Sequence, residues 1–98
     1  MTLREKVVTV EQYGEVTVRE LDAEDWYWLY QDCSDDGKLK RREYVRRLIL
    51  AGCYKDGKRL FDDGDEQKVK DISPRVDYAK LANAALAVNL ADDPKEAS

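Results

Sequence analysis

The sequence contains no histidine, which excludes the Ser-His-Asp and Cys-His arrangements of nucleophilic catalysis and most zinc sites. Phosphate-binding loops of the GxxxxGKS, GxxxxGKT and GxGxxG types are missing as well. No Asp or Glu lies in an apolar stretch of the kind that general acid catalysis requires. We therefore expect a protein that is not an enzyme and that uses no cofactor and no metal ion.

Long apolar runs are also absent. No stretch approaches the roughly 18 apolar residues that a membrane-spanning helix needs, and the N-terminus does not resemble a secretory signal. We therefore expect no membrane contact and a location in the cytoplasm. In that reducing compartment the only two cysteines, Cys33 and Cys53, are expected to be buried thiols rather than a disulfide.

Basic residues are outnumbered by acidic ones. The chain has 17 Lys and Arg against 21 Asp and Glu, a net charge of −4, whereas chains that bind nucleic acid normally carry an excess of Lys and Arg. One basic cluster covers residues 38–42 and continues at Arg46 and Arg47. Because acids flank this cluster, we interpret it as the solvated face of a helix and expect no nucleic acid partner.

What remains is a short, highly charged globular chain. Its 98 residues, 43% apolar and 39% charged, predict one domain with a thin core, because a chain of this size hides only roughly 60–70% of its unfolded surface. We expect the domain to span residues 1–91. Residues 92–98 contain Pro94 and small polar side chains, and they are expected to form a flexible tail.

The spacing of apolar residues predicts the α+β class, mainly α, with an N-terminal β-hairpin followed by three to four helices. Alternating β-branched residues predict strands over 6–10 and 15–20, with Tyr13 and Gly14 in the turn between them. The predicted helices cover residues 22–33, 39–52, 65–72 and 74–90. Between the second and third helices, residues 53–61 predict a hairpin-like connection with an Asp-Gly turn.

The helix expected over 22–33 carries apolar side chains on two sides. Asp22 is a suitable N-cap for it. One apolar stripe, a plausible core face, contains Trp26, Leu29, Tyr30 and Cys33. Trp28 falls on the opposite, polar side. Either the hairpin covers Trp28, or Trp28 is a contact residue for a partner protein.

The helix expected over 39–52 has one main stripe, which contains Tyr44, Val45, Leu48 and Ala51. Gly52 is expected to stop this helix. Leu50 lies off the stripe, so it is a second candidate for contact with a partner.

The last helix, expected from Ser73 as N-cap and Pro74 as the first helical residue, also has two apolar stripes. The first contains Tyr78, Leu81, Ala85 and Val88, and the nearly opposite second contains Val76, Leu86, Ala87 and Leu90. A helix of this kind is either sandwiched in a core or buried at an interface, and so small a chain favours the interface. The predicted partner-binding residues of the whole chain are Trp28, Leu50, Val76, Leu86 and Leu90.

Residues 32–43 fit the twelve-residue calcium loop of the EF-hand at many positions. Oxygen-bearing side chains stand at positions 1, 3 and 5, Gly37 at position 6 and Glu43 at position 12. However, Lys40 at position 9 cannot bind the ion, and three further cations in or beside the loop oppose it. We favour an ordinary acidic turn in which Gly37 has a positive φ, and keep a calcium-binding helix–loop–helix module as an alternative.

The order of these segments carries a resemblance. The segment 16–21 leads into an acid-capped helix, and Asp36-Gly37-Lys38 precedes an Arg-rich helix. The segment 54–61, which ends in DGKRLF, is followed by an acidic loop and, at 78–90, by the closing helix. In this order the segments resemble the tail assembly chaperones of long-tailed (siphovirus-type) bacteriophages over about residues 15–91. Two departures are Asp22, where the family has Thr or Ser, and the absence of the family's usual Gly near Leu90.

The resemblance implies a mainly helical fold with a small β element and a role in tail assembly. Chaperones of this family bind the long, apolar-striped tape measure protein, keep it soluble and help tail tube (major tail) subunits polymerise around it. They act in the host bacterial cytoplasm and are absent from the mature virion. Further partners implied are other copies of the chain and a frameshifted longer form. A small structural or connector protein of the phage is the second alternative.

Overall fold

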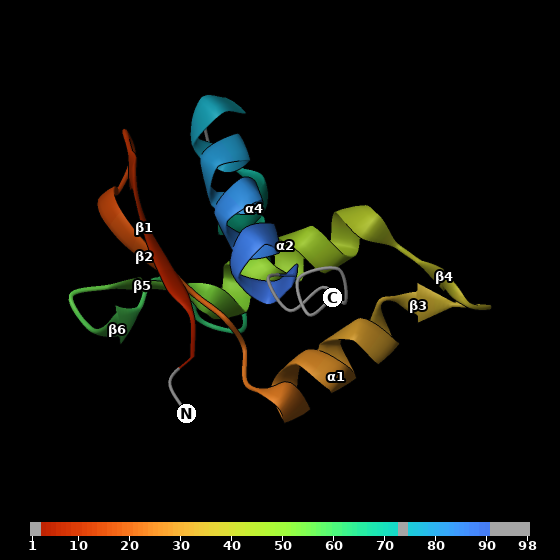
Figure 1. Cartoon of the computed structure of the whole chain (residues 1–98). Helices are drawn as coiled ribbons and strands as arrows, with labels where there is room; N and C mark the ends of the chain where they lie inside the picture. Colours follow the sequence, from red (N-terminus) through yellow and green to blue (C-terminus); the bar gives the residue numbers. More distant parts are fainter. Residues whose placement is uncertain (1–2, 73–74, 91–98) are drawn as a thin grey trace.

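The computed structural model describes residues 3–72 and 75–90 and orders them as a small sheet with helices packed on one face (Figure 1). The elements are β1 (Glu5–Val10), β2 (Gly14–Arg19), α1 (Ala23–Asp32), β3 (Ser34–Asp35), β4 (Lys38–Leu39), α2 (Arg41–Gly52), β5 (Cys53–Lys55), β6 (Lys58–Arg59), α3 (Glu66–Lys70) and α4 (Arg75–Leu90). The predicted α+β class, an N-terminal hairpin followed by helices, is confirmed. The predicted start of the last helix, Ser73 and Pro74, lies outside the described residues.

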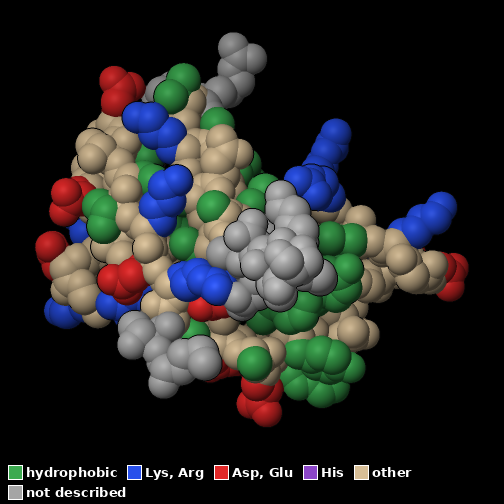
Figure 2. Space-filling model, in the orientation of Figure 1, with side chains coloured by type: hydrophobic (Ala, Val, Ile, Leu, Met, Phe, Trp, Pro, Cys, Tyr) green, Lys and Arg blue, Asp and Glu red, His purple; other side chains and the backbone are tan. Residues whose placement is uncertain are grey.

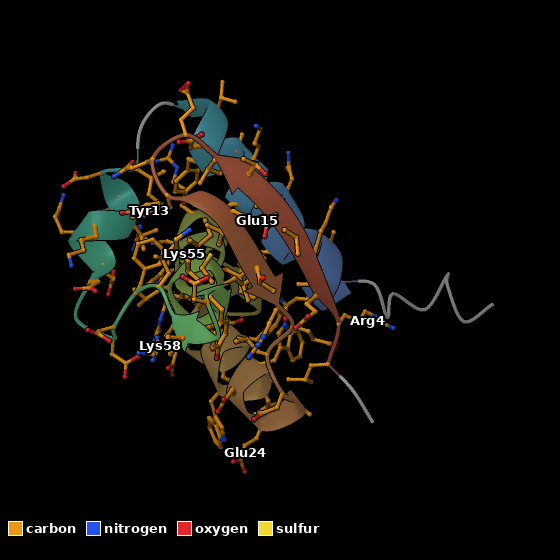
Figure 3. The ribbon with its side chains drawn as sticks, turned by 90° about the vertical axis from the view of Figure 1, so that its left-hand side faces the viewer. Arg4, Tyr13, Glu15, Glu24, Lys55 and Lys58 are labelled. Carbon is orange, nitrogen blue, oxygen red and sulfur yellow. The ribbon has the colours of Figure 1, made fainter. Side chains whose placement is uncertain are left out.

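The main sheet is antiparallel, in the order β1-β2-β5-β6. The predicted hairpin pairs Val10 with Gly14 across a three-residue turn, and Gly14 has a φ of 75°, a left-handed conformation that glycine adopts at no steric cost. α4 packs on the inner face of β1 and β2, and α2 packs on α4. None of the helices in the described residues covers the opposite face of the hairpin, which points at the viewer in Figure 3.

The core follows from the alternation of the two hairpin strands. Val10, Val16 and Val18 point inward and are at most 1% exposed, which the period of two in a strand dictates. They meet apolar side chains of α2 and α4, including Leu48, Ile49, Leu81, Ala84 and Ala85. The first stripe predicted for the last helix is therefore confirmed as a core face.

Polar side chains of α4 fix the hairpin at both ends. Asp77 of α4 is only 1% exposed. Its carboxylate accepts hydrogen bonds from the backbone N–H groups of Glu11 and Gln12, which lie in the hairpin turn, each at 3.0 Å. At the far end the backbone N–H of Leu21 donates to Oδ1 of Asn89 at 3.1 Å. These bonds satisfy backbone donors that the strand ladder leaves unpaired.

The helix α1 packs on α2 through aromatic rings. Asp22 caps α1 as predicted, its side chain accepting from the N–H of Asp25 at 2.8 Å. Trp26 donates its indole N–H to the hydroxyl of Tyr44 at 2.9 Å, and Tyr30 meets Tyr44 edge to face at 5.7 Å between ring centroids. Within α1 itself Leu29 is the buried residue.

Leu50 corrects one prediction. Its side chain is only 8% exposed and belongs to the core, so it is not on the surface where a partner could reach it. The reason is that α2 packs against α1, α3, α4 and β2, which buries more than one of its faces. A rule that assigns one buried stripe to each helix underestimates the burial of such a central helix.

Within the segment 32–43, the central residues 34–39 form a tight β-hairpin between the end of α1 and the start of α2. Ser34 pairs with Leu39 and Asp35 with Lys38, and the two central residues, Asp36 and Gly37, have φ values of 52° and 76°. Two consecutive positive φ values are the mark of a type I′ turn. The expected positive φ of Gly37 is confirmed, and the short strands β3 and β4 on either side of the turn were not predicted.

Both cysteines are free and buried, as predicted. Burial raises the pKa of Cys53 to about 12. Burial also raises the pKa of Cys33, with Glu43 acting in the same direction and Arg47 in the opposite one. Each thiol therefore behaves as a small apolar side chain that stays protonated at neutral pH.

Candidate partner-binding site

A cleft of about 540 Å³ opens between α1, the C-terminal half of α2 and the strands β2 and β5. Its apolar lining consists of Leu3, Leu21, Trp28, Leu29, Ala51 and Tyr54. Its charged lining consists of Arg19, Glu20, Asp22, Asp25, Asp32, Arg47, Arg59 and Asp63. A concave surface with an apolar floor and a charged rim is the usual form of a site that receives a side chain of a partner.

Trp28 is the most prominent residue of this cleft. Its side chain is 59% exposed and meets Tyr27, itself 49% exposed, edge to face at 5.1 Å between ring centroids. The hairpin leaves Trp28 uncovered because α1 uses its opposite side to pack on α2. Hydrophobic side chains gather over α1 at the lower right of Figure 2. Exposed aromatic rings of this kind are enriched at protein interfaces.

The three arginines of the cleft are each held by an acid. Arg47 pairs with Asp32 at 3.6 Å and Arg59 with Asp63 at 3.0 Å. Arg19 pairs with Glu5 at 3.1 Å, and its guanidinium lies 4.2 Å above the ring centre of Tyr54. Since five carboxylates and three guanidinium groups line the cleft, its rim carries an excess of negative charge.

The structure does not bring the other predicted partner-binding residues into this cleft. Val76 is 60% exposed in the first turn of α4, beside the hairpin turn that Asp77 holds. The cleft adjoins the other end of the hairpin, roughly 20 Å away along a six-residue strand. Leu86 is partly buried against the core, and the side chain of Leu90 lies outside the described residues.

Several residues that line the cleft were not predicted from the sequence. Leu3, Leu21 and Tyr54 come from separate segments, so no local spacing links them to Trp28. Gly52 also lines the cleft. A Cβ at this position would lie only 2.8 Å from the carbonyl oxygen of Arg19, so a larger residue would not fit there. The role predicted for Gly52 was to stop a helix; the structure adds that its small size lets α2 approach β2 closely.

Residues that could bind a metal do not gather within the described parts of the chain: no group of three or more Cys, Asp or Glu side chains there could hold an ion. Asp32, the first residue of the segment 32–43 that resembles an EF-hand loop, forms an ion pair with Arg47 at 3.6 Å. No helix in the described ranges is long and apolar enough to span a membrane.

Comparison with known proteins finds a similar fold among the solved structures. No protein-family model and no curated protein sequence matches this chain. Among solved structures, the fold matches the tail assembly chaperone of bacteriophage HK97 with a TM-score of 0.59 and 21% sequence identity, over 90% of this chain and 83% of that one. The resemblance inferred from the order of the segments is thus confirmed at the level of the fold: this chain folds like a phage tail assembly chaperone.

Proposed function

We propose that this chain is a tail assembly chaperone of a long-tailed phage. It binds the tape measure protein, keeps it soluble and promotes polymerisation of tail tube subunits around it. It acts in the cytoplasm of the host bacterium and is absent from the mature virion. The observation that carries this proposal is the shared fold over nine-tenths of the chain, together with the order of segments in the sequence.

The cleft beside α1 supplies a surface suited to that task. An apolar side chain of the partner would lie against Trp28 and Leu3, 59% and 42% exposed, and would remove them from water. The excess of carboxylates on the rim favours a segment in which cations flank the apolar side chain. A long helical protein with an apolar stripe offers such segments repeatedly.

Weak individual contacts suffice for this function. Many copies of a small chain bound along one long partner act together, so repetition supplies the overall affinity. The net charge of −4 would then keep the coated partner in solution, because like-charged complexes repel one another.

Co-expression with the tape measure protein encoded by the same phage tests the proposal. We expect the tape measure protein to move from the insoluble to the soluble fraction when this chain is present, and to co-purify with it. Trp28→Ala should weaken this capture at least about tenfold and leave the circular dichroism spectrum unchanged. Val7→Ala is the matched control, because Val7 is equally exposed, at 54%, on the outer face of the sheet.

Two results would contradict the proposal. If the tape measure protein stays insoluble with the wild-type chain, the chain is not its chaperone. If the chain is found in purified virions at stoichiometric amounts, it is a structural or connector protein. Equal loss of capture in Trp28→Ala and Val7→Ala would contradict only the role of the cleft, and not the chaperone function.

A further inference from the structure

A second hollow, of about 500 Å³, lies between the N-terminal half of α2, the end of α3 and the first turn of α4. Its lining consists of Arg41, Arg42, Val45, Arg46, Lys70 and Tyr78, and we call it the basic groove. The Trp28 cleft adjoins the C-terminal half of the same helix. The two hollows are therefore separate surfaces.

The basic groove concentrates positive charge in a chain whose net charge is negative. Four cations surround it, and only Arg46 has an ion pair within the described residues, with Glu66 at 3.2 Å. Arg42 and Arg46 are also four residues apart on α2, a spacing at which like charges destabilise a helix. The free chain thus holds a charge arrangement that costs stability and that an acidic partner would relieve.

Two residues that line the groove, Val45 and Tyr78, are not charged, and we call them its floor. Val45 is 9% exposed, and Tyr78 is half-buried. Burial raises the pKa of Tyr78, while Arg46, which lines the same groove, acts in the opposite direction. The floor therefore combines an aliphatic surface with a neutral hydroxyl, and the guanidinium and ammonium groups stand around it.

We propose that the basic groove is a docking site for an acidic segment of a partner protein. Carboxylates of the segment contact Arg41, Arg42 and Lys70, and one apolar side chain between them rests on Val45 and Tyr78. Charge complementarity selects this occupant. A nucleic acid is disfavoured, because the groove is short, has an apolar floor and belongs to a chain with 21 acidic residues against 17 basic ones. This assignment does not depend on the proposed function.

Fluorescence anisotropy tests the assignment with a labelled synthetic peptide that has one Phe flanked on both sides by Glu residues. We expect saturable one-to-one binding that weakens with added salt. The peptide with Gln in place of every Glu should bind at least about tenfold more weakly. Arg42→Glu on α2 and Lys70→Glu on α3 should each weaken binding of the acidic peptide by a similar factor. Both residues are exposed, so these variants should keep the native circular dichroism spectrum.

Lys58→Glu is the matched control, an exposed cation on β6 outside the groove, and it should bind the acidic peptide within about twofold of the wild type. The proposal is overturned by absence of saturable binding, or by equal losses in Lys58→Glu and Arg42→Glu. It is also overturned if a short single-stranded DNA binds more tightly than the peptide and is lost in Arg42→Glu. Sedimentation provides the last check: self-association that disappears in Arg42→Glu would assign the groove to a second copy of the chain instead.

Discussion

The molecule has two regions of different character. The packed body, formed by β1, β2, α2 and α4, holds side chains that are at most 1% exposed, such as Val16, Ile49 and Leu81. The arm, formed by α1, β3 and β4, points away from α4 in Figure 1 and packs mainly on α2. Its exposed aromatic residues are Tyr27 and Trp28. Fully buried apolar side chains are thus concentrated in the packed body, and the two exposed aromatic rings lie on the arm.

This difference suggests that the packed body provides stability and that the arm provides the binding surface. The proposed chaperone function requires a stable fold and also apolar surface that would normally be buried away from water. Placing that surface on a helix anchored by few buried contacts separates the two requirements. Variants in the packed body should therefore change the free energy of unfolding, and variants on the arm should change binding.

The largest expected effect is that of Leu81→Ala, which removes a fully buried side chain from α4. We expect it to lower the free energy of unfolding by about 3 kcal/mol. Tyr27→Ala on the arm should change that free energy by no more than about 0.5 kcal/mol. Urea titration followed by circular dichroism measures both. Similar losses in the two variants would show that the arm is part of the same core.

Asp77→Ala should have the next largest effect, about 2 kcal/mol. This variant removes the carboxylate that accepts hydrogen bonds from the backbone N–H groups of Glu11 and Gln12. Asp77→Asn retains one acceptor oxygen and should lose about half as much. The comparison uses the same urea titration. An unchanged midpoint in Asp77→Ala would mean that α4 does not hold the hairpin turn.

The two thiols should report local opening of the arm. Cys33 caps the end of α1, whereas Cys53 begins β5 next to β2. With single-cysteine variants, Cys53→Ala and Cys33→Ala, we expect a thiol reagent at neutral pH to label Cys33 at least about tenfold faster than Cys53. Equal rates would indicate that both regions open in a single cooperative step.

The smallest expected effect concerns the hydrogen bond that joins the arm to the body. Trp26→Phe removes the indole donor to Tyr44 and should lower the free energy of unfolding by about 1 kcal/mol. Tyr44→Phe and the double variant complete a mutant cycle, which isolates the pair from the loss of ring packing. A coupling energy of zero would show that the hydrogen bond does not stabilise the arm and that only the ring contacts attach it to the body.

Much of the fold could be predicted from periodicity. The alternation in the hairpin, the cap at Asp22 and the first stripe of the last helix each follow from a local rule. β3 and β4 were missed because two-residue strands leave no alternation to detect. The pairing of β2 with β5, which shapes the cleft, joins Thr17 to Tyr54, and no local rule encodes so distant a register.

The candidate sites were predicted less completely. Trp28 was chosen as a candidate because it breaks the amphipathic pattern of α1, and it is exposed. Leu50 was chosen because it lies off the main stripe of α2, but it is buried because α2 packs on several elements. The basic cluster was interpreted as a solvated face, since nothing in the sequence shows that Lys70 and Tyr78 close a hollow beside Arg42. Sites assembled from several elements become visible only when the tertiary structure is known.

The hydrogen bonds between α4 and the hairpin also set an order of folding. They join residues separated by 66 and 68 positions in the chain, and synthesis proceeds from the N-terminus. The hairpin is therefore made first and receives its stabilising partner last. Until α4 has been synthesised, the inner face formed by Val10, Val16 and Val18 lacks its cover, and long-range contacts of this kind slow folding. The inner face of the hairpin thus depends for its cover on α4, an element that is synthesised long after the strands on which it packs.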